Sequence, residues 1–364
     1  MKKRIVLAFG TRPEGIKMAP VYRALAARDS FEPIILLTGQ HKTQLAQALE
    51  IFDVPATMDL QVMTDRQTLP ELAARILPRA AEAFRDLKAD YVLVHGDTLT
   101  TFVSAWAAFL EKIPLGHVEA GLRSGSLAEP FPEEANRVLT DALCDSFFAP
   151  TQGARANLLR AGVDSRQIFV TGQTAVDAIQ FASKRGTLPE GVPADGPVVT
   201  VTLHRRENWP VLPQLAKCLA ELARKHSQWT FLFPVHLNPI VREAVMPTLS
   251  GIPNVILTDP LEYDHMAALL ARSRLILTDS GGLQEEGASL GVPVAVVRNV
   301  TERPEGVDAG IVTLLGNEPE RAMASFAALM DDEARIGRMA ASKNPYGDGR
   351  ASERIAEALE LRLK

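Results

Sequence analysis

The stretch His117–Arg123, HVEAGLR, and the segment Pro130–Arg137, PFPEEANR, are the part of the sequence that decides the fold. One short apolar run leads through a His-Gly pair to Asp97, and a second run delivers Glu119. Short apolar runs that are bounded by Gly and Pro and alternate with helical patterns indicate buried parallel strands. Ligands of open α/β sheets bind outside the carboxyl ends of such strands. We therefore expect Asp97 and Glu119 at the mouth of one crevice.

Two further charged residues, Glu133 and Arg137, follow the Pro-rich loop at the start of a predicted helix. Residues four apart share one face of a helix, so this pair is expected to point the same way. Carboxylates gathered at one rim suggest proton transfer. The alternative is that Glu133 and Glu134 only favour a helix N-terminus, where acidic side chains are stabilising.

Composition limits the class of protein. A chain of 364 residues is long enough for two domains of ordinary size, and its 46% hydrophobic content supports large cores. The net charge of −5 argues against a broad nucleic-acid or anionic-membrane footprint. Cys144 and Cys218 fall in different halves, which disfavours a disulfide framework. No run approaches a membrane span, and the N-terminal apolar run is too short for a secretory signal. We expect a cytoplasmic protein.

The N-terminal strand, residues 4–9, is followed by a glycine turn and a helix that extends to about Ala27. A strand, a glycine turn and a helix form an anion site at the helix N-terminus. Arg12 and Lys17 would add positive charge there, although ordinary surface charge is the alternative. The turn lacks the glycines of a dinucleotide fingerprint, and Gly-x-Gly-x-x-Gly occurs nowhere in the chain, which counts against NAD.

Strand–helix repetition predicts the domain organisation. Residues 1–172 read as one doubly wound, Rossmann-like domain, and the Pro/Gly-dense segment that follows marks a boundary. Residues 173–345 read as a second Rossmann-like domain, and residues 346–364 carry a helix expected to cross back to the first. The predicted fold class is thus α/β, with two doubly wound domains whose polar rims can face each other across a cleft.

The second half contains its own phosphate-type turn, Ser280-Gly281-Gly282, at a predicted helix start. Its backbone N–H groups would suit a phosphate, and Glu286, one turn further on, could accept from the two hydroxyls of a ribose. Together with Arg12, Lys17, Arg206 and Arg303, this turn favours a nucleoside diphosphate held between the domains. His204 precedes two arginines, and a neutral imidazole, a phosphate donor or a structural hydrogen-bonding role stay open for it. The seven His residues show no metal-binding spacing.

At this point the chain resembles the non-hydrolysing UDP-N-acetylglucosamine 2-epimerases, over essentially its whole length. The motifs that carry the resemblance are Phe9–Glu14 with Lys17, His95–Thr98, His117–Arg123, Pro132–Arg137, His204–Glu207, Pro234–Pro239, Thr278–Glu286, Thr301–Glu305 and Asn344–Gly349. The resemblance implies the two-domain architecture of GT-B glycosyltransferases, no NAD and no metal. It also implies UDP-GlcNAc and UDP-ManNAc as ligands, and a homodimer.

By the same resemblance, the enzyme expels UDP from C1 while C2 loses its proton, which leaves 2-acetamidoglucal, and UDP then re-adds. The implied catalytic residues are Asp97, Glu119, Glu133, Arg137 and His204. The implied substrate-binding residues are Arg12, Lys17, Arg206, Met266, Ser280, Gly281, Gly282, Glu286 and Arg303. Two positions depart from the family pattern: Leu203 replaces a small residue, and Met266 stands where some relatives carry an aromatic near the uracil.

Relatives of this kind also bind a second, regulatory UDP-GlcNAc. The matching residues are Gln40, Arg66, Gln67 and His236, whereas Thr43 stands where regulated relatives can have Gln. We therefore expect weak activation by UDP-GlcNAc.

Three other functions stay open. A hydrolysing epimerase would release UDP and free ManNAc, and a glycosyltransferase of the same architecture would need an acceptor. A non-catalytic UDP-sugar sensor would keep the glycine turn but would not need Asp97, Glu119 and Glu133, all of which are present.

Overall fold

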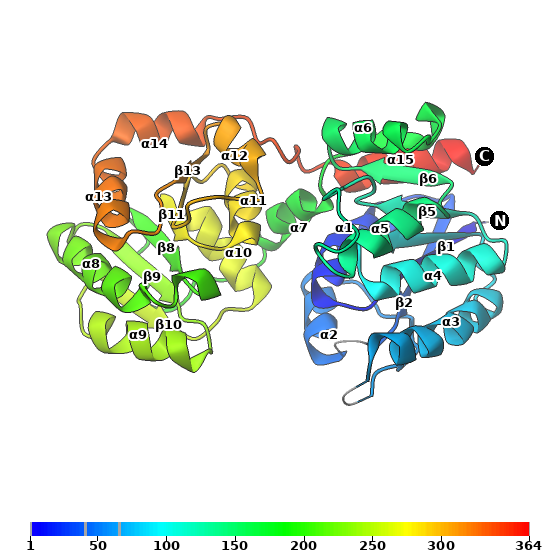
Figure 1. Cartoon of the computed structure of the whole chain (residues 1–364), viewed down its shortest axis with the longest axis horizontal. Helices are drawn as coiled ribbons and strands as arrows, with labels where there is room; N and C mark the ends of the chain where they lie inside the picture. The colour runs from blue at the N-terminus through cyan, green and yellow to red at the C-terminus, as the bar shows by residue number, and fades with distance from the viewer. Residues whose placement is uncertain (1, 40–41, 65–66, 364) are drawn as a thin grey trace. The chain divides into compact units, whose positions relative to one another are not determined.

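The computed structural model describes residues 2–39, 42–64 and 67–363. The chain divides into two compact units (Figure 1). Unit 1 is Met1–Ala178 together with Gly347–Lys364, and unit 2 is Ile179–Tyr346. Each unit is built on its own parallel sheet, so the expected pair of doubly wound α/β domains is confirmed.

Unit 1 contains a seven-stranded parallel sheet in the order β3-β2-β1-β4-β5-β6-β7. Its strands are β1 (Lys3–Phe9), β2 (Phe31–Leu37), β3 (Met58–Asp59), β4 (Tyr91–His95), β5 (Leu115–Val118), β6 (Ser146–Ala149) and β7 (Ile168–Val170). Its helices are α1 (Arg12–Ala26), α2 (Lys42–Ile51), α3 (Leu69–Asp86), α4 (Leu99–Leu110), α5 (Glu133–Asp141), α6 (Gln152–Arg160) and α15 (Ala351–Arg362). Helix α7 (Thr174–Ala182) begins in unit 1 and ends in unit 2, because the boundary falls after Ala178.

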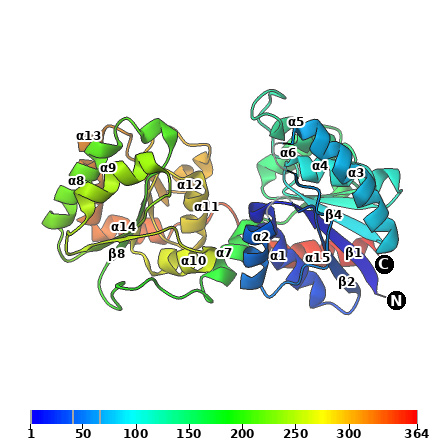
Figure 2. The ribbon, with the colours of Figure 1, turned by 90° about the horizontal axis from the view of Figure 1, so that it is seen from below.

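Helices cover both faces of this sheet, so its central strands are apolar on both sides. Helices α3, α4 and α5 lie side by side on one face, and α1, α2 and α15 lie on the other (Figure 2). Val6 and Ala8 of β1 pack into the core beneath α3 and α4, while Ile5, Leu7 and Phe9 alternate with them and are equally buried. Strands that are buried on both faces have continuous apolar sequences, which is why the pattern was readable.

The C-terminal helix α15 belongs to unit 1 and packs on α1 (Figures 1 and 2). Glu360 accepts hydrogen bonds from Arg28 Nη1 and Ser30 Oγ, both at 2.8 Å. At the other end of α15, Asp177 of α7 accepts from the backbone N–H of Ser352 at 2.8 Å. Unit 2 is therefore an insertion between two segments that fold together.

Unit 2 contains a six-stranded parallel sheet in the order β10-β9-β8-β11-β12-β13. Its strands are β8 (Val198–Thr202), β9 (Thr230–Pro234), β10 (Val255–Thr258), β11 (Leu275–Thr278), β12 (Val294–Val296) and β13 (Val312–Leu314). Its helices are α8 (Leu212–Lys225), α9 (Pro239–Leu249), α10 (Tyr263–Arg272), α11 (Gly281–Ser289), α12 (Pro304–Asp308), α13 (Pro319–Met330) and α14 (Glu333–Ala340). The order reverses beside β8 and β11, whose carboxyl ends are a topological switch point, where ligands of such sheets bind.

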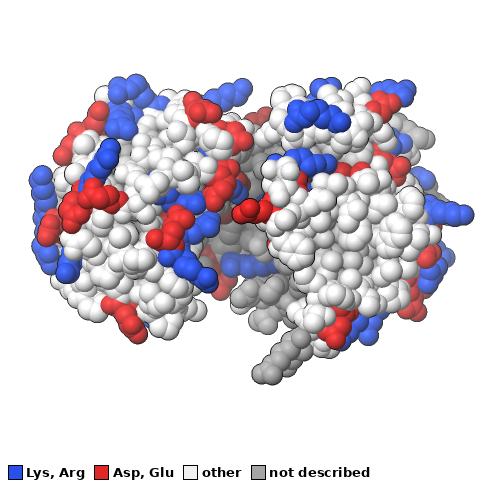
Figure 3. All heavy atoms as spheres, viewed as in Figure 1, with Lys and Arg blue, Asp and Glu red and all other residues white. Residues whose placement is uncertain are grey.

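The surface is mixed in charge but contains apolar side chains on α4. Figure 3 shows acidic and basic residues interspersed over the face in view. Trp106, Phe109 and Leu110 of α4 are between 37% and 50% exposed, and the rings of Trp106 and Phe109 stack at 5.7 Å. In the part of the chain that the structure describes, no helix is both long and apolar enough to cross a membrane.

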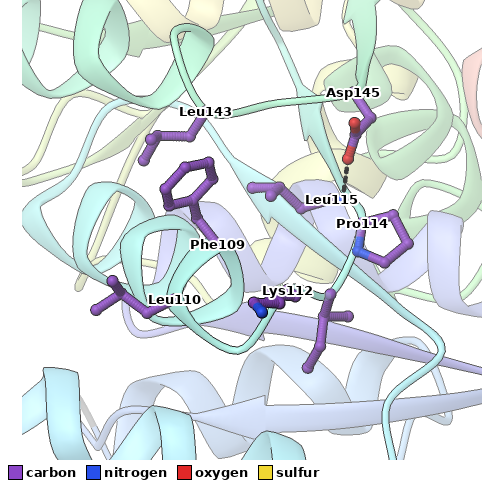
Figure 4. A pocket seen from close by; sticks show the side chains of 8 residues that line it. Phe109, Leu110, Lys112, Pro114, Leu115, Leu143 and Asp145 are labelled. Carbon is purple, nitrogen blue, oxygen red and sulfur yellow. Dashed lines mark hydrogen bonds between the residues drawn. The ribbon is translucent and has the colours of Figure 1, made fainter.

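A hollow lies at the amino-terminal edge of the unit 1 sheet (Figure 4). It is lined by Phe109, Leu110, Lys112, Ile113, Pro114, Leu115, Leu143 and Asp145. Asp145 there accepts from the backbone N–H of Leu115, the first residue of β5, at 2.9 Å. Since Asp97 and Glu119 follow the carboxyl ends of β4 and β5, this hollow is at the opposite edge from the predicted chemistry.

Candidate active site

The ends of β4 and β5 bring the two predicted carboxylates of unit 1 to one edge of the sheet. His95 of β4 pairs with Val118 of β5, and the N–H of Gly96 donates to the carbonyl of Val118 at 3.0 Å. Gly96 has a φ of +71°, a left-handed conformation that a glycine adopts without steric cost. Asp97 follows this turn, and Glu119 comes directly after the paired Val118. The expected placement of Asp97 and Glu119 at neighbouring strand ends is what the structure shows.

Glu119 has an unusual backbone. Its φ is +70°, which costs a non-glycine residue about 1–2 kcal/mol. The N–H groups of Glu119 and Ala120 both donate to the carbonyl of Phe148 on β6, at 3.1 and 3.2 Å, and hold this conformation. Strained backbone clusters at functional positions, where it directs a side chain that regular geometry would point elsewhere.

The Glu119 carboxylate meets nitrogen atoms from two other elements. Lys17 Nζ of α1 lies 2.6 Å from Glu119 Oε2, and His95 Nε2 lies 3.7 Å from the same oxygen. Burial by itself raises the pKa of Glu119, but the Lys17 ammonium and then His95 outweigh it and lower that pKa to about 2. Burial lowers the pKa of His95 to about 3, against the attraction of Glu119. Near neutral pH the cluster is therefore an ionised carboxylate, an ammonium and a neutral imidazole.

Asp97 is held by helix α5. An Arg137 guanidinium nitrogen, Nη2, pairs with Asp97 Oδ2, and Asn136 Nδ2 donates to the Asp97 carbonyl at 2.9 Å. Arg137 Nη1 also lies 3.1 Å from Oε2 of Glu134, which is 2% exposed. Arg137 thus pairs with Glu134 and Asp97. Glu133 is half-buried in the first turn of α5, and its carboxylate has no ion-pair or hydrogen-bond partner within residues 2–39, 42–64 and 67–363.

Glu134 was read only as a helix-start residue, and the structure gives it a second function. Its carboxylate accepts from the backbone N–H of Ser124 at 3.0 Å and of Gly125 at 3.4 Å. These contacts tie α5 to the loop that follows the HVEAGLR stretch. The signal that the sequence offered was a pair of adjacent glutamates, Glu133 and Glu134, at the start of a predicted helix. Their spacing alone does not show which of the two side chains is buried.

A second buried network was not expected from the sequence. His117 is fully buried, with Nδ1 2.7 Å from Asp141 Oδ1 and Nε2 2.7 Å from the carbonyl of Gly96. Arg123 Nη2 lies 2.6 Å from the other Asp141 oxygen. Burial raises the pKa of Asp141, but His117 and Arg123 outweigh it and the net shift is downward. Helix α5 therefore supports the turn before Asp97 through Asp141 and His117.

The β1–α1 turn is fixed by Glu14, which is 3% exposed. Its Oε2 accepts from the N–H groups of Gly10 and Thr11 at 3.0 and 2.7 Å, and its Oε1 accepts from Thr98 Oγ1 at 2.6 Å. The Thr11-x-x-Glu14 spacing is a capping box, a signal that the sequence offered. Arg12 is the first residue of α1, half-exposed, and has no hydrogen-bond or ion-pair partner in the described chain. Its guanidinium is available to an anion at this helix N-terminus.

In unit 2, Asp279 organises the carboxyl ends of β8 and β11. It is fully buried and accepts from the N–H groups of His204 and Arg205, at about 3.0 and 2.9 Å, and from Asn208 Nδ2 at 3.1 Å. The His204 ring stacks on His236 with 5.4 Å between centroids. Burial lowers the pKa of His204 below its usual range, although Asp279 opposes this shift. The neutral imidazole is thus the dominant form near neutral pH.

Two arginines flank the glycine turn of unit 2. Ser280 is the N-cap of α11 and makes no side-chain capping hydrogen bond. A Cβ at Gly281 would lie 3.4 Å from Arg205 Nη2 and 3.7 Å from the guanidinium carbon of Arg303. Gly282 is exposed, with open space where a Cβ would be. The backbone N–H groups and the two guanidinium groups together form a cationic turn.

The predicted cations of unit 2 differ in their surroundings. Arg303 Nε pairs with Glu285 Oε1 at 2.5 Å, and Glu285 outweighs burial to raise the pKa of Arg303. Arg206 is exposed and lies over the ring of Trp209 at 5.5 Å. Arg205, which the sequence reading passed over, is the neighbour of Gly281. Nothing in a run of two arginines shows which one points to the turn.

The remaining predicted residues are placed as follows. Glu286 lies half-buried on α11, and Met266 of α10 packs against Val198, Leu232 and Leu269. Gln67 accepts from Arg75 Nη1 at 2.8 Å. Gln40 and Arg66 lie outside the described residues, as does the side chain of Thr43.

Comparison with known proteins agrees with this geometry. A family model described as UDP-N-acetylglucosamine 2-epimerase matches residues 23–360. UDP-N-acetylglucosamine 2-epimerases of Yersinia pestis and of Escherichia coli K12 are each 44% identical to this chain, with 98% of both chains covered.

Solved structures give the same result. The UDP-GlcNAc 2-epimerase of Neisseria meningitidis, bound to UDP-GlcNAc, is 40% identical with a TM-score of 0.89, covering 99% of this chain and 100% of the other. The Methanocaldococcus jannaschii enzyme, in complex with UDP-GlcNAc and UDP, is 33% identical with a TM-score of 0.72, covering 99% and 100%. A glycosyltransferase of Rickettsia africae, 15% identical with a TM-score of 0.62 and coverage of 100% and 99%, shares the fold alone. The chain belongs to the UDP-N-acetylglucosamine 2-epimerase family.

Proposed function

We propose that this protein interconverts UDP-GlcNAc and UDP-ManNAc by reversible epimerisation at C2, without hydrolysis. Its relatives at 44% identity are named for the 2-epimerase activity, and the Neisseria meningitidis relative was solved with UDP-GlcNAc bound. The observation that carries the proposal is the pair Asp97 and Glu119 at the ends of β4 and β5, with Glu119 held ionised in strained backbone.

The proposed reaction has two steps. In the first, the C2 proton passes to a carboxylate, the C1–O bond to UDP breaks and a C1=C2 double bond forms, giving 2-acetamidoglucal. In the second, a carboxylic acid returns a proton to the other face of C2 while a UDP oxygen re-forms the bond to C1. The C2 proton of the substrate is not next to a carbonyl, so loss of UDP must accompany its removal.

Three carboxylates are assigned to this proton transfer, namely Asp97, Glu119 and Glu133. Positioned acid–base groups are worth about 10²–10⁴-fold, or roughly 3–5 kcal/mol, so they do not lower the barrier sufficiently alone. Charge stabilisation of the departing diphosphate supplies a comparable share. We assign it to Arg12, Lys17, His204, Arg303 and the N–H groups of Ser280, Gly281 and Gly282. Arg137 orients Asp97, and Met266 and Glu286 are assigned to nucleotide binding. Of the two neighbouring arginines, we assign Arg205, which lies beside Gly281, to the diphosphate in place of Arg206, which lies over Trp209.

The test is incubation of the protein with UDP-GlcNAc alone in D₂O, followed by NMR. We expect solvent deuterium at C2 of both UDP-GlcNAc and UDP-ManNAc, with a small release of UDP and 2-acetamidoglucal. Epimerisation that retained the original C2 hydrogen would rule out the elimination route. Irreversible release of UDP and free ManNAc would identify a hydrolysing epimerase. Lack of turnover without an added acceptor would favour a glycosyltransferase, and binding without turnover would favour a sensor.

Regulation by UDP-GlcNAc is a further part of this proposal. The residues assigned to it are Gln40, Thr43, Arg66, Gln67 and His236. Thr43 offers a shorter polar group than Gln would, so the coupling loses one or two hydrogen bonds of about 0.5–1.5 kcal/mol each. We expect weak activation of the reverse reaction by a trace of UDP-GlcNAc, and stronger activation in Thr43→Gln. Strict dependence of the native protein on that trace, or no gain in the variant, would contradict this assignment.

A further inference from the structure

Among the residues that the structure describes, Lys17 and His95 both approach the Glu119 carboxylate, and only Lys17 is close enough to hydrogen-bond with it. The ammonium of Lys17 lies 2.6 Å from Glu119 Oε2, a short charge-assisted hydrogen bond. His95 Nε2 lies 3.7 Å from the same oxygen, beyond hydrogen-bonding distance. The two nitrogens come from different elements, α1 and β4, and approach one carboxylate oxygen. They therefore compete for a single acceptor.

His95 is the unexplained member of this cluster. It is 3% exposed, and neither ring nitrogen has a hydrogen-bond partner among the residues that the structure describes. A neutral imidazole carries one N–H donor and one acceptor, and leaving both buried and unsatisfied costs free energy. Its backbone is firmly held, because the His95 carbonyl accepts from Thr101 Oγ1 at 2.5 Å. The imidazole therefore lies next to Glu119, and its N–H donor has no hydrogen-bond partner among the described residues.

Lys17 is the more exposed of the two partners. Its side chain is flexible and 24% exposed, and it lies on α1, whose first residue is Arg12. A helix N-terminus that carries an arginine attracts anions, and a diphosphate that binds there attracts the Lys17 ammonium as well. The ligand of the proposed function carries such a diphosphate. Its arrival offers Lys17 another partner, which is more highly charged than Glu119.

We propose that Lys17 and His95 are alternating partners of Glu119: Lys17 holds the carboxylate until an anionic ligand draws the ammonium away, and the Nε2–H of His95 then donates to it. This proposal rests on the proposed function, because it identifies a diphosphate as the ligand that triggers the exchange. The ring and the carboxylate need to approach by only about 1 Å to reach a normal N–H···O distance of about 2.9 Å. Lys17 and His95 act through Glu119 and are positioning residues in this exchange.

The exchange of partners changes the proton affinity of the Glu119 carboxylate, and therefore its strength as a general base. Lys17 on α1, His95 on β4 and His117 on β5 are the groups that oppose the effect of burial on Glu119. A carboxylate paired with an ammonium binds a proton weakly and is a poor general base. When the ammonium leaves, burial dominates and the proton affinity of Glu119 rises. The neutral His95 donor keeps the carboxylate oriented without restoring a positive charge, so Glu119 becomes an effective base only when ligand is present.

The first test measures the Glu119 titration directly, by ¹³C NMR of protein labelled at the glutamate side-chain carboxyl carbon. Glu119→Gln assigns the signal, and calorimetry on the same samples shows that UDP is bound. We expect UDP to raise the Glu119 midpoint by about one to three pH units, which is the effect of removing an adjacent opposite charge. Lys17→Met should show the raised midpoint without UDP. Lys3→Met, which removes a lysine paired with Asp90 at the amino-terminal edge of the sheet, is the matched control and should not move it.

The outcomes separate this proposal from the proposed function. If UDP binds and the Glu119 midpoint stays in place, the exchange is wrong while the epimerase proposal stands. An unchanged midpoint in Lys17→Met would show that Lys17 does not control Glu119, and would overturn the exchange without any ligand. Failure of UDP to bind at all would overturn both.

The second test concerns His95. Gln places an amide near the position of the imidazole Nε2, whereas Leu removes both polar atoms. In the UDP complex, we expect His95→Leu to raise the Glu119 midpoint further. The same variant should move the acidic limb of the kcat pH profile, which reports the ligand-bound enzyme, while His95→Gln restores both. In the protein without ligand, Lys17 holds the carboxylate and His95 Nε2 lies 3.7 Å away, so His95→Leu should raise the midpoint by less than it does in the UDP complex. If the His95 variants shifted the Glu119 midpoint equally with and without UDP, the imidazole would have only a structural role. That result would overturn the exchange.

Discussion

At the residue scale, Glu119 is surrounded by side chains that come from distant parts of the chain, Lys17 on α1 and His95 on β4. The strand ends of β4 and β5 locate Asp97 and Glu119, because apolar runs in a parallel sheet fix where each polar residue emerges. Lys17 was expected to bind phosphate, and its contact with Glu119 spans 102 positions of the chain. No local pattern carries a pairing over that distance. The choice between Glu133 and Glu134, and between Arg205 and Arg206, also depends on tertiary packing.

A first prediction tests the three assigned carboxylates. Asp97→Asn, Glu119→Gln and Glu133→Gln should each reduce kcat by about 10²-fold or more, because each removes a group that gains or loses a proton. The affinity for UDP should be retained, and calorimetry measures it. Poor UDP binding with normal turnover at saturation would instead make these residues binding groups.

A second prediction separates the two neighbouring arginines of unit 2. Arg205 lies beside Gly281, whereas Arg206 lies over Trp209. Arg205→Ala should weaken UDP binding about 10-fold to 100-fold, the loss of a charge-assisted hydrogen bond to phosphate. Arg206→Ala is the matched control and should change the dissociation constant, measured by calorimetry, no more than about threefold. A larger loss in Arg206→Ala would reverse the assignment.

At the scale of elements, apolar runs in the sequence predict most of the strands. The remaining strands form because they hydrogen-bond to a neighbouring strand. The apolar runs 146–149, 198–202 and 275–278 form strands with the expected bounds. Two of the four edge strands, β3 and β13, were not expected. β3 is only two residues, Met58–Asp59, and exists because it pairs with Leu36 and Leu37 of β2. A segment of two residues is too short to show an alternation of apolar and polar residues. It is a strand only because it hydrogen-bonds to β2.

Helix α5 gives a third prediction, which concerns pH. The pKa of Asp141 is lowered from its usual 3.8 by His117 and Arg123, which outweigh burial. A lowered folded-state pKa stabilises the fold above the unfolded value, and that contribution is lost as the pH falls through the folded value. Asp141→Asn should therefore destabilise unit 1 by roughly 3 kcal/mol at pH 7, and this deficit should shrink once the pH drops below about 4.

Trp106 offers a way to measure this effect. It is the tryptophan of unit 1, and replacing Trp209 and Trp229 by Phe leaves its fluorescence to report urea unfolding of that unit alone. Asp164→Asn is a suitable control, because Asp164 also has a lowered pKa, through Arg166, but lies at the surface. A deficit that stayed constant between pH 7 and pH 3 would contradict an ionised, buried Asp141.

At the scale of the whole molecule, composition and strand–helix alternation predict two α/β units, and the structure shows two parallel sheets. We expect a homodimer, so light scattering of the purified protein should give twice the chain mass of 39.6 kDa. A mass of one chain across the micromolar range would contradict this expectation.

The return of α15 to α1 has a consequence for the way in which the protein is made. A ribosome releases the whole of unit 2 before residues 347–364 appear, and at roughly 5–20 residues per second this delay is on the order of ten seconds or more. During that interval α1 lacks the helix that packs on it, so unit 1 is unfinished while unit 2 is already able to fold. We therefore expect a ribosome-associated chaperone to bind nascent chains that are stalled before residue 347. Synthesis of residues 347–364 should end this binding, because α15 can then pack on α1.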